Sequence, residues 1–446
     1  MAGYGTALDA DFFAGSVSFF HDLVGRLCAD ATAAMTHDQL EELIEVRGRE
    51  LLRLLLQDHL DLRAVREEQS LAAAKRADRR ADRSAARVMV DAGGVAHRVI
   101  ETGHERCLAS VVGPVTVRRA AFRAGGTANL YPADARLNLS TGRHSHGLRK
   151  RAVVEAVRGS FDDAVAAIRR CCGNVVAKRQ VERLVIAAAR DVEAFYEARV
   201  PLPCTAATLL VISCDGKGVP MRPEALRPAT ARAAAVKGGN TYRTRLAGGE
   251  KSGRKRMATV AAVYDAEPAV RRPHDVITLS GSGTAMKNGP GPNWRTAWSL
   301  HTPGDPAAER WVAIQLLAIL FGRLEETLTE LRRQARAAEL TAEQRKGIET
   351  CTKYLMAKRG YLGYAEALAA GWPIATGVVE GACRHLVADR LNITGARWGL
   401  DGAEAVLKLR AVISNGHLEP YWTFHLQQEH HRVHQARYQD GYQLTA

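Results

Sequence analysis

The run Thr208-Leu-Leu-Val-Ile-Ser-Cys-Asp215-Gly-Lys-Gly218 is the most apolar strand-like stretch in the chain. Consecutive apolar and β-branched residues predict a buried strand, and the glycines that follow predict a loop directly after it. Asp215 would then stand at the tip of the strand with its carboxylate accessible. That placement suits a metal ligand, because divalent cations such as Mg²⁺ prefer carboxylate oxygens.

A second acid far along the chain has a similar character. Glu380 lies in Trp372-Pro-Ile-Ala-Thr-Gly-Val-Val-Glu380-Gly-Ala-Cys-Arg384-His385, which predicts the start of a helix with an acid and two basic groups within two turns. Arg384 and His385 could hold the carboxylate or contact a DNA phosphate, and the alternative is an ordinary ion pair on the helix surface. Two such acids together with a third would hold a pair of divalent ions for phosphoryl chemistry.

A second predicted strand, Met257-Ala-Thr-Val-Ala-Ala-Val-Tyr-Asp265, follows a glycine-rich basic loop. A basic loop beside a metal site is typical of a surface that touches a phosphate backbone, and the alternative is a charged insertion without ordered structure. The candidate DNA contacts in and next to this loop are Lys237, Arg243, Arg245, Arg254, Lys255 and Arg256.

A capped helix, a glycine turn and a second helix are predicted between Ser160 and Arg183. The second helix opens with Lys178 and Arg179, which could meet DNA if this is a helix-turn-helix. An ordinary helical hairpin has the same outline. A further candidate DNA contact, Arg397, lies in the glycine-rich turn after the Glu380 helix.

The remaining pattern predicts five regions. Helices from Asp11 to about Arg87 precede a hairpin over 95–123 with its turn at Gly113-Pro114, and residues 305–368 are helical throughout. The regions are 1–125 (helices and a small hairpin), 126–200 (helix-turn-helix-like), 201–295 (first part of an α/β core), 296–370 (helical insertion) and 371–446 (the Glu380 helix and a basic tail).

Composition favours a polyanionic partner. The 446 residues include 62 Lys plus Arg against 48 Asp plus Glu, a net charge of +14, and the pI is near 9.6. Nucleic acid is therefore the expected partner, and a charged solvated surface is the alternative. Eight cysteines without a CxxC pair indicate reduced thiols in a cytoplasmic protein. His430-His431-x-x-His434 predicts a solvated basic face. The sequence contains no apolar run of about 20 residues, so no membrane span is predicted.

Four segments together resemble one family. They are Cys214-Asp-Gly-Lys-Gly-Val219, Lys255-Arg-Met-Ala-Thr-Val-Ala-Ala-Val-Tyr-Asp265, the Gly371 to His385 segment quoted in part above, and Ile393-Thr-Gly-Ala-Arg-Trp-Gly-Leu-Asp-Gly-Ala-Glu-Ala-Val-Leu-Lys408. These resemble the insertion-sequence transposases of the ISKra type, bacterial enzymes of the DDE class. The upstream block 138–183 also looks like the family, so the likeness covers most of the chain.

The resemblance implies an α/β catalytic core of RNase H-like type, a mainly helical N-terminal DNA-binding region and a helical insertion. Asp215 matches the first catalytic acid and Glu380 the last. The implied cofactor is a pair of Mg²⁺ ions, and the implied partners are DNA, as terminal inverted repeats and target, and further copies of the chain. Such an enzyme would work in the bacterial cytoplasm, at the nucleoid when bound to DNA.

The second catalytic aspartate of the family has no match here. In the family it follows a strand between the second-strand block and the helical insertion, whereas this chain passes through the glycine-rich stretch 279–295 without an apolar strand that ends in Asp. The core and its two-ion site are therefore expected to be incomplete, with an exposed edge beside the Asp215 strand. Asp265, Asp275 and Asp305 are the substitute candidates, and the resemblance gives Asp265 no catalytic match.

Three functional interpretations remain open. The first is a transposase that binds terminal repeats and performs metal-dependent cleavage and strand transfer. The second is an internally deleted, non-catalytic copy that acts as a DNA-binding remnant or a repressor of transposition. The third is a basic helical protein with an unrelated structural role, which salt-insensitive behaviour towards DNA would support.

Overall fold

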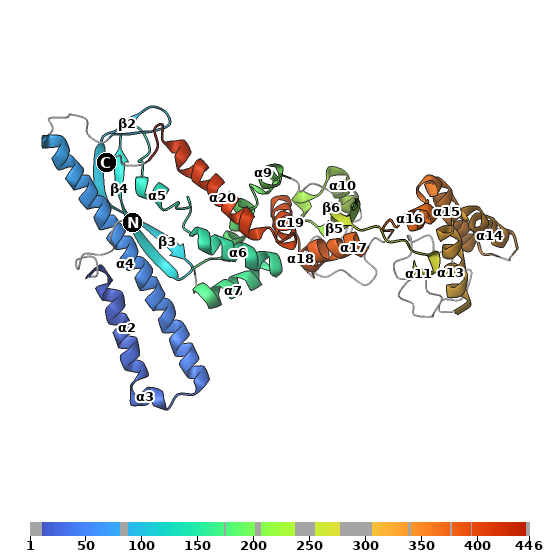
Figure 1. Cartoon of the computed structure of the whole chain (residues 1–446), viewed down its shortest axis with the longest axis horizontal. Coiled ribbons are helices and arrows are strands. Elements are labelled where there is room, and N and C mark those ends of the chain that lie inside the picture. The colour runs from blue at the N-terminus through green and yellow to red at the C-terminus, as the bar shows by residue number, and fades with distance from the viewer. Residues whose placement is uncertain are drawn as a thin grey trace. The chain divides into compact units, whose positions relative to one another are not determined.

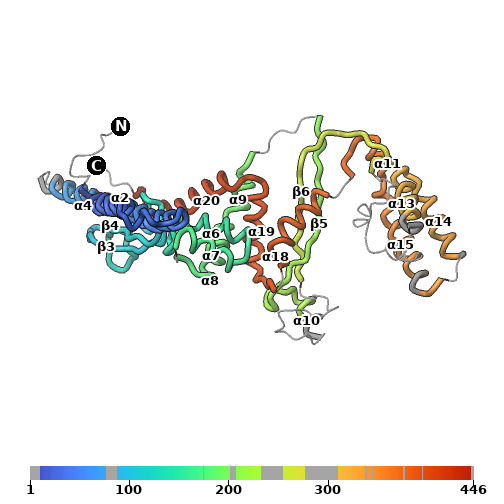
Figure 2. The backbone as a smooth tube through the Cα atoms, turned by 90° about the horizontal axis from the view of Figure 1, so that it is seen from below, coloured from blue at the N-terminus to red at the C-terminus, as the bar shows by residue number. Residues whose placement is uncertain are grey.

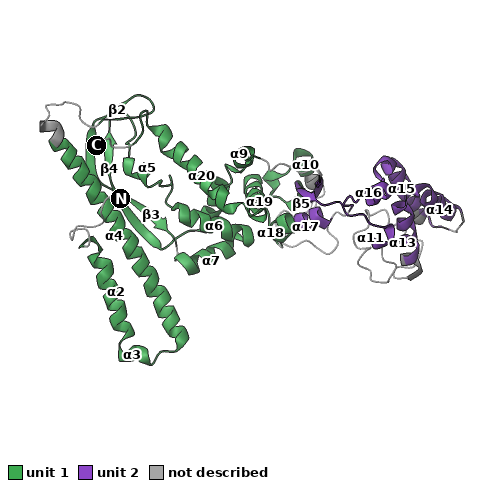
Figure 3. Cartoon of the chain, in the orientation of Figure 1, with its two compact units in different colours: residues 1–200, 218–258, 385–446 green, residues 201–217, 259–384 purple. Residues whose placement is uncertain are grey.

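The fold comes from a computed structural model. The residues that it describes are 11–80, 88–173, 175–200, 207–236, 255–276, 306–337, 340–374, 377–393 and 395–442. They belong to two compact units, each assembled from separate stretches of the chain (Figure 3). Unit 1 comprises Met1–Val200, Gly218–Ala258 and His385–Ala446, and unit 2 comprises Pro201–Lys217 and Thr259–Arg384.

Unit 1 is mixed α/β with helices predominating and small antiparallel sheets (Figure 1). Its elements are η1 (Asp11–Phe13), α2 (Ala14–Leu27), α3 (Asp30–Ala33), α4 (His37–Arg80), β1 (Met89–Val90), β2 (Ala96–His97), β3 (Val99–Ser110), β4 (Gly113–Arg123), α5 (Pro132–Arg136), α6 (His146–Arg158), α7 (Phe161–Cys172), α8 (Lys178–Ala188), α9 (Val192–Glu197), η2 (Pro223–Ala225), α10 (Pro228–Val236), α18 (Asp389–Leu391), α19 (Leu400–Ser414), α20 (Leu418–Val433) and η5 (Gln435–Arg437).

The hairpin of β3 and β4 is covered by the long helix α4. Leu60 of α4 packs on Leu108, Val115 and Val117, and the Gln57 side chain bonds both the N–H and the C=O of Thr116, at 2.8 and 3.0 Å. The predicted hairpin is confirmed. Its turn lies at residues 111–112, because Ser110 Oγ donates to the Gly113 carbonyl at 2.7 Å and β4 already begins at Gly113.

The helix, glycine turn and helix predicted over 160–183 are confirmed as α7 and α8. Ser160 caps α7 by accepting from the Asp163 N–H at 3.1 Å, and the Asp163 carboxylate accepts the Ser160 N–H in return. α7 ends at Gly173, whose φ of +80° suits a residue without Cβ. α6 and α19 pack against α8 and bury its apolar face, so the N-terminal turn of α8 is left at the surface.

Unit 2 contains α11 (Pro273–Val276), α13 (Pro306–Leu320), α14 (Leu324–Ala337), α15 (Ala342–Lys358), η3 (Arg359–Tyr361), α16 (Tyr364–Ala369) and α17 (Gly377–Ala382). Its core is formed by α13, α14 and α15, where Leu328, Leu331, Ile348 and Leu355 are almost fully buried. The helical region predicted between 305 and 368 is therefore confirmed for the described residues. None of the helices in the described ranges is both long and apolar enough to cross a membrane.

Three elements run from one unit into the other: β5 (Leu209–Pro220), β6 (Lys255–Ala266) and the π-helical segment η4 (Cys383–Ala388). β5 and β6 lie side by side as a two-stranded sheet (Figure 2). Both predicted strands are confirmed. In the described residues they form a sheet of these two strands alone.

Two expectations for the Asp215 strand are wrong. The strand does not end at Asp215 but continues to Pro220, with Gly218 so close to Lys255 that a Cβ there would lie 2.8 Å from Lys255 Cδ. The strand is also not buried, since Leu210 and Ile212 are 57% and 64% exposed. In the described part of the chain β5 pairs with β6 alone, and the alternate side chains Leu210 and Ile212 lie open to solvent on one face of this two-stranded sheet.

We expect β5 to open far more readily than β4. A two-stranded ribbon with little burial is marginally stable, whereas β4 is covered by α4. Amides 207–214 should therefore exchange with solvent at least about 100-fold faster than the β4 amides between Val115 and Phe122, measured by hydrogen exchange with mass spectrometry. Equal protection of the two strands would show that another segment covers β5.

Candidate functional site

Asp215 and Glu380, far apart in the sequence, meet around Cys383 within unit 2. Burial raises the pKa of the Cys383 thiol, a hydrogen bond with the Asp215 carboxylate and the charge of Glu380 raise it further, and the charge of Lys217 lowers it. Cys383 is 3% exposed, whereas both carboxylates are exposed. A buried thiol therefore bonds one accessible acid and feels the charge of a second.

Local backbone geometry directs the chain towards Glu380. Gly371 has a φ of +74°, and a Cβ at this position would lie 2.6 Å from the backbone nitrogen of Ala269. The Gly371 carbonyl accepts from that same nitrogen at 2.9 Å. A residue with a side chain would separate these two segments, so their close contact requires a glycine at position 371. After Glu380 the helix widens into π-helical η4, a feature that often occurs at functional sites.

The structure does not bring Asp265 to Asp215. Gly218 lies opposite Lys255 in the antiparallel ribbon, so Asp265, near the far end of β6, lies roughly seven residues of strand away, on the order of 20 Å. That distance is too long for both carboxylates to bind one pair of ions about 4 Å apart. Asp275 lies in the short helix α11, and Asp305 lies outside the described residues.

The chemistry of this site does not fit a pair of Mg²⁺ ions. Mg²⁺ requires oxygen ligands in near-octahedral geometry, and two ions need shared carboxylates. The site supplies two carboxylates and a thiol whose raised pKa favours the protonated form, a poor ligand for a hard cation. Within the described ranges no group of three or more His, Cys, Asp or Glu side chains is arranged to hold a metal.

The basic residues singled out in the sequence are spread over several elements. Lys178 and Arg179 are exposed on the first turn of α8, where Lys178 pairs with Asp162. Lys255 donates to the side chain of Asn392 at 3.2 Å, and Arg256 is half-buried. Arg384 and His385 are exposed in η4, and Arg397 is half-buried. The other four, Lys237, Arg243, Arg245 and Arg254, lie outside the described residues.

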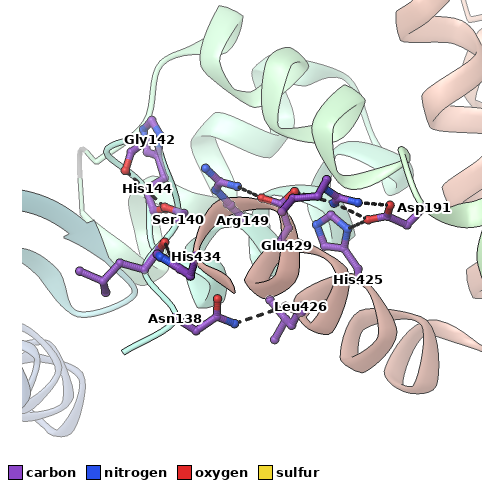
Figure 4. A network of polar contacts seen from close by, with 12 residues as sticks. Asn138, Ser140, Gly142, His144, Arg149, Asp191, His425, Leu426, Glu429 and His434 are labelled. Carbon is purple, nitrogen blue, oxygen red and sulfur yellow. Dashed lines mark hydrogen bonds and ion pairs between the residues drawn. The ribbon is translucent and has the colours of Figure 1, made fainter. Parts of the chain in front are cut away.

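Unit 1 contains a buried polar network that no sequence pattern predicted (Figure 4). Arg432 donates to both carboxylate oxygens of Asp191 at 2.6 and 2.8 Å, and His425 Nδ1 donates to Asp191 at 2.7 Å. Arg432 also bonds Glu429, which faces Arg149 across 3.7 Å.

The solvated face expected for the C-terminal histidines is wrong for His434. This residue is 5% exposed, and its Nε2 donates to the Leu139 carbonyl at 2.8 Å. No local signal marks this burial, because His434 lies just past the end of α20 and its partner Leu139 is 295 residues away along the chain.

No protein-family model matches the chain, and a search of curated proteins found no match. The likeness to ISKra-type transposases therefore rests on the sequence segments quoted above.

Proposed function

We propose that this chain is a DNA-binding protein of the insertion-sequence transposase type, which binds the terminal repeats of an element and in which metal-dependent cleavage and strand transfer are strongly impaired. The observation that carries the proposal is that Asp215 and Glu380, placed by the family resemblance at the first and last catalytic positions, meet at one site around Cys383.

The DNA-binding part of the proposal is supported by α7 and α8. A capped first helix, a glycine turn and an exposed basic start of the second helix are the parts that a helix-turn-helix uses in the major groove. Lys178 and Arg179 would contact phosphates there, and the net charge of +14 attracts DNA at longer range. Arg384 and His385 are additional candidate contacts near the acid site.

We expect neutralisation of the α8 start to weaken DNA binding. The double variant Lys178→Gln and Arg179→Gln removes two candidate phosphate contacts, so affinity for duplex DNA should fall at least about tenfold. The slope of log affinity against log salt concentration should also decrease in magnitude by about two, one for each lost phosphate contact. Fluorescence anisotropy at several salt concentrations measures both quantities. Arg333→Gln, at a 64% exposed side chain in unit 2, is the matched control and should bind normally.

The impaired cleavage follows from the missing middle acid. With two carboxylates, neither the attacking water nor the leaving oxygen would have a fully coordinated ion beside it. If the core is RNase H-like, its second-acid strand is the part that the chain lacks. The functional consequence would be a DNA-binding remnant or a repressor that occupies the ends of an element without cutting them.

An active transposase is the second candidate, favoured by the same convergence of Asp215 and Glu380. A cleavage assay on DNA that carries the element's own ends, with and without Mg²⁺, distinguishes the active transposase from the impaired DNA-binding protein. We expect binding without product. Mg²⁺-dependent cleavage that Asp215→Asn abolishes would overturn the proposed impairment and establish the active enzyme, because that substitution removes charge with little change of shape.

A further inference from the structure

Unit 1 contains a cavity of about 240 Å³ between the β3–β4 hairpin, α5 and the C-terminal end of α20. Its lining is unusually cationic. Arg106, Arg119 and Arg437 face a single acid, Asp134. His434 also lines the cavity, and burial lowers the pKa of its imidazole, which favours the neutral form. The lining therefore carries an excess of positive charge.

The guanidinium groups of Arg106 and Arg119 are largely buried. Arg106 and Arg119 share one carboxylate oxygen, Asp134 Oδ2, and the Arg106 guanidinium is 3.3 Å from it. The side chains of Arg106, Arg119 and Asp134 are 17%, 11% and 13% exposed. Burial lowers the pKa of Arg106, and the neighbouring charge of Arg119 lowers it further. Arg106 Nη2 also donates to the backbone carbonyls of Ser140 and Gly142. These carbonyls carry no net charge, so two guanidiniums share one carboxylate and leave a positive charge that an anion would compensate.

The hydrogen-bonding groups of this cavity are also incomplete. Arg119 Nε, a donor, and Asp134 Oδ1, an acceptor, are buried without a protein partner. The Arg119 guanidinium is held in place, with its Cζ 3.8 Å from the ring centroid of Tyr131. A singly protonated phosphate has oxygens that accept from guanidiniums and a hydroxyl that can donate to a carboxylate. An internal DNA phosphodiester has no such hydroxyl.

We propose that this cavity binds a phosphate monoester or inorganic phosphate, held by Arg106, Arg119 and Arg437 and oriented by Asp134. The phosphate could be free or could be the terminal phosphate of a nucleic-acid strand. Only the second source depends on the proposed DNA function. The site itself stands on the charge and geometry of the cavity.

The test is calorimetric titration of the full chain with inorganic phosphate at constant ionic strength. Arg437→Gln removes an exposed cation from the cavity and leaves the Arg106, Arg119 and Asp134 cluster intact, so its dissociation constant should rise about tenfold. Arg158→Gln, at a 73% exposed arginine outside the cavity, is the matched control and should leave it unchanged. The absence of saturable binding, or equal losses in both variants, would overturn the proposal.

Two further arms strengthen the test. Asp134→Asn removes the carboxylate that would accept the phosphate hydroxyl, so binding should lose its preference for the singly protonated form of phosphate, and an unchanged pH dependence of binding would contradict the assigned role of Asp134. A single-stranded oligonucleotide with a 5′-phosphate should displace inorganic phosphate more effectively than its 5′-hydroxyl counterpart if strand ends are the source. Equal failure of both oligonucleotides, with phosphate binding intact, would identify free phosphate as the ligand and leave the DNA function to its own test.

Discussion

Asp191→Ala is expected to lower the free energy of unfolding of unit 1 by about 3 to 5 kcal/mol, the range measured when one partner is removed from a buried ion pair. Asp191 accepts two hydrogen bonds from Arg432 and one from His425, and its side chain is 6% exposed. Without the carboxylate, a guanidinium would keep its charge in a poorly solvated position and His425 would lose its buried acceptor. Urea unfolding measures the change in unfolding free energy, and hydrogen exchange of the α20 amides shows where in unit 1 the stability is lost.

Glu193→Gln is the matched control, because Glu193 lies in the neighbouring helix α9 and its side chain is 75% exposed. Its pairing with Lys408 is a surface ion pair, so the unfolding free energy should change by less than about 1 kcal/mol. If Asp191→Ala cost no more than this control, the network in Figure 4 would not hold α9, α6 and α20 together as described.

Acidification is expected to destabilise unit 1, and His146 should account for much of the loss. Burial lowers the pKa of His146 to about 4, and the charge of Arg149 adds to the effect. Both ring nitrogens are buried without a protein partner. Between the ordinary value of about 6.5 and the folded value, the unfolded chain binds a proton that the folded chain does not. Stability is therefore full above about pH 6.5 and falls by on the order of 3 kcal/mol as the pH approaches 4.

Other groups around His146 influence the same pH range. The charge of Glu429 raises its pKa, and those of His425 and His434 lower it. His146→Leu removes the titrating group, so its unfolding free energy should fall less than that of the wild type between pH 7 and 4.5. His37→Leu, at an 87% exposed histidine, is the control and should follow the wild type. Parallel pH profiles for the wild type and His146→Leu would show that His146 titrates normally.

Most secondary structure could be predicted because its signals are local. Ser160 with Asp163 marks the start of α7, and Gly173 marks its end. Alternating apolar and polar residues predicted β3 and β4. The turn, however, was predicted at Gly113-Pro114, because glycine and proline are common in turns. The strands pair as far as Ser110 and Gly113, where a side-chain bond from Ser110 accompanies the turn, and glycine and proline statistics contain neither feature.

Burial of the Asp215 strand could not be predicted, because it depends on what lies on both faces of the sheet. Leu210 and Ile212 have the composition of a core strand but are exposed in β5. The strand also extends past Asp215, because Gly216 and Gly218 tolerate an extended ladder beside Lys255. The sequence singled out Asp215 and Glu380, whereas the contact of Asp215 with Cys383 and the remoteness of Asp265 required three-dimensional information.

The most direct measurement for the proposed function is equilibrium binding of the full chain to duplex DNA carrying the element's ends, as a function of salt. If the chain is a DNA-binding protein of this type, the logarithm of the association constant should fall linearly with the logarithm of salt concentration, with a slope that reflects several neutralised phosphates, and Lys178→Gln with Arg179→Gln should reduce that slope by about two. Absent or salt-insensitive binding would contradict the proposal and favour an unrelated structural role for this basic chain.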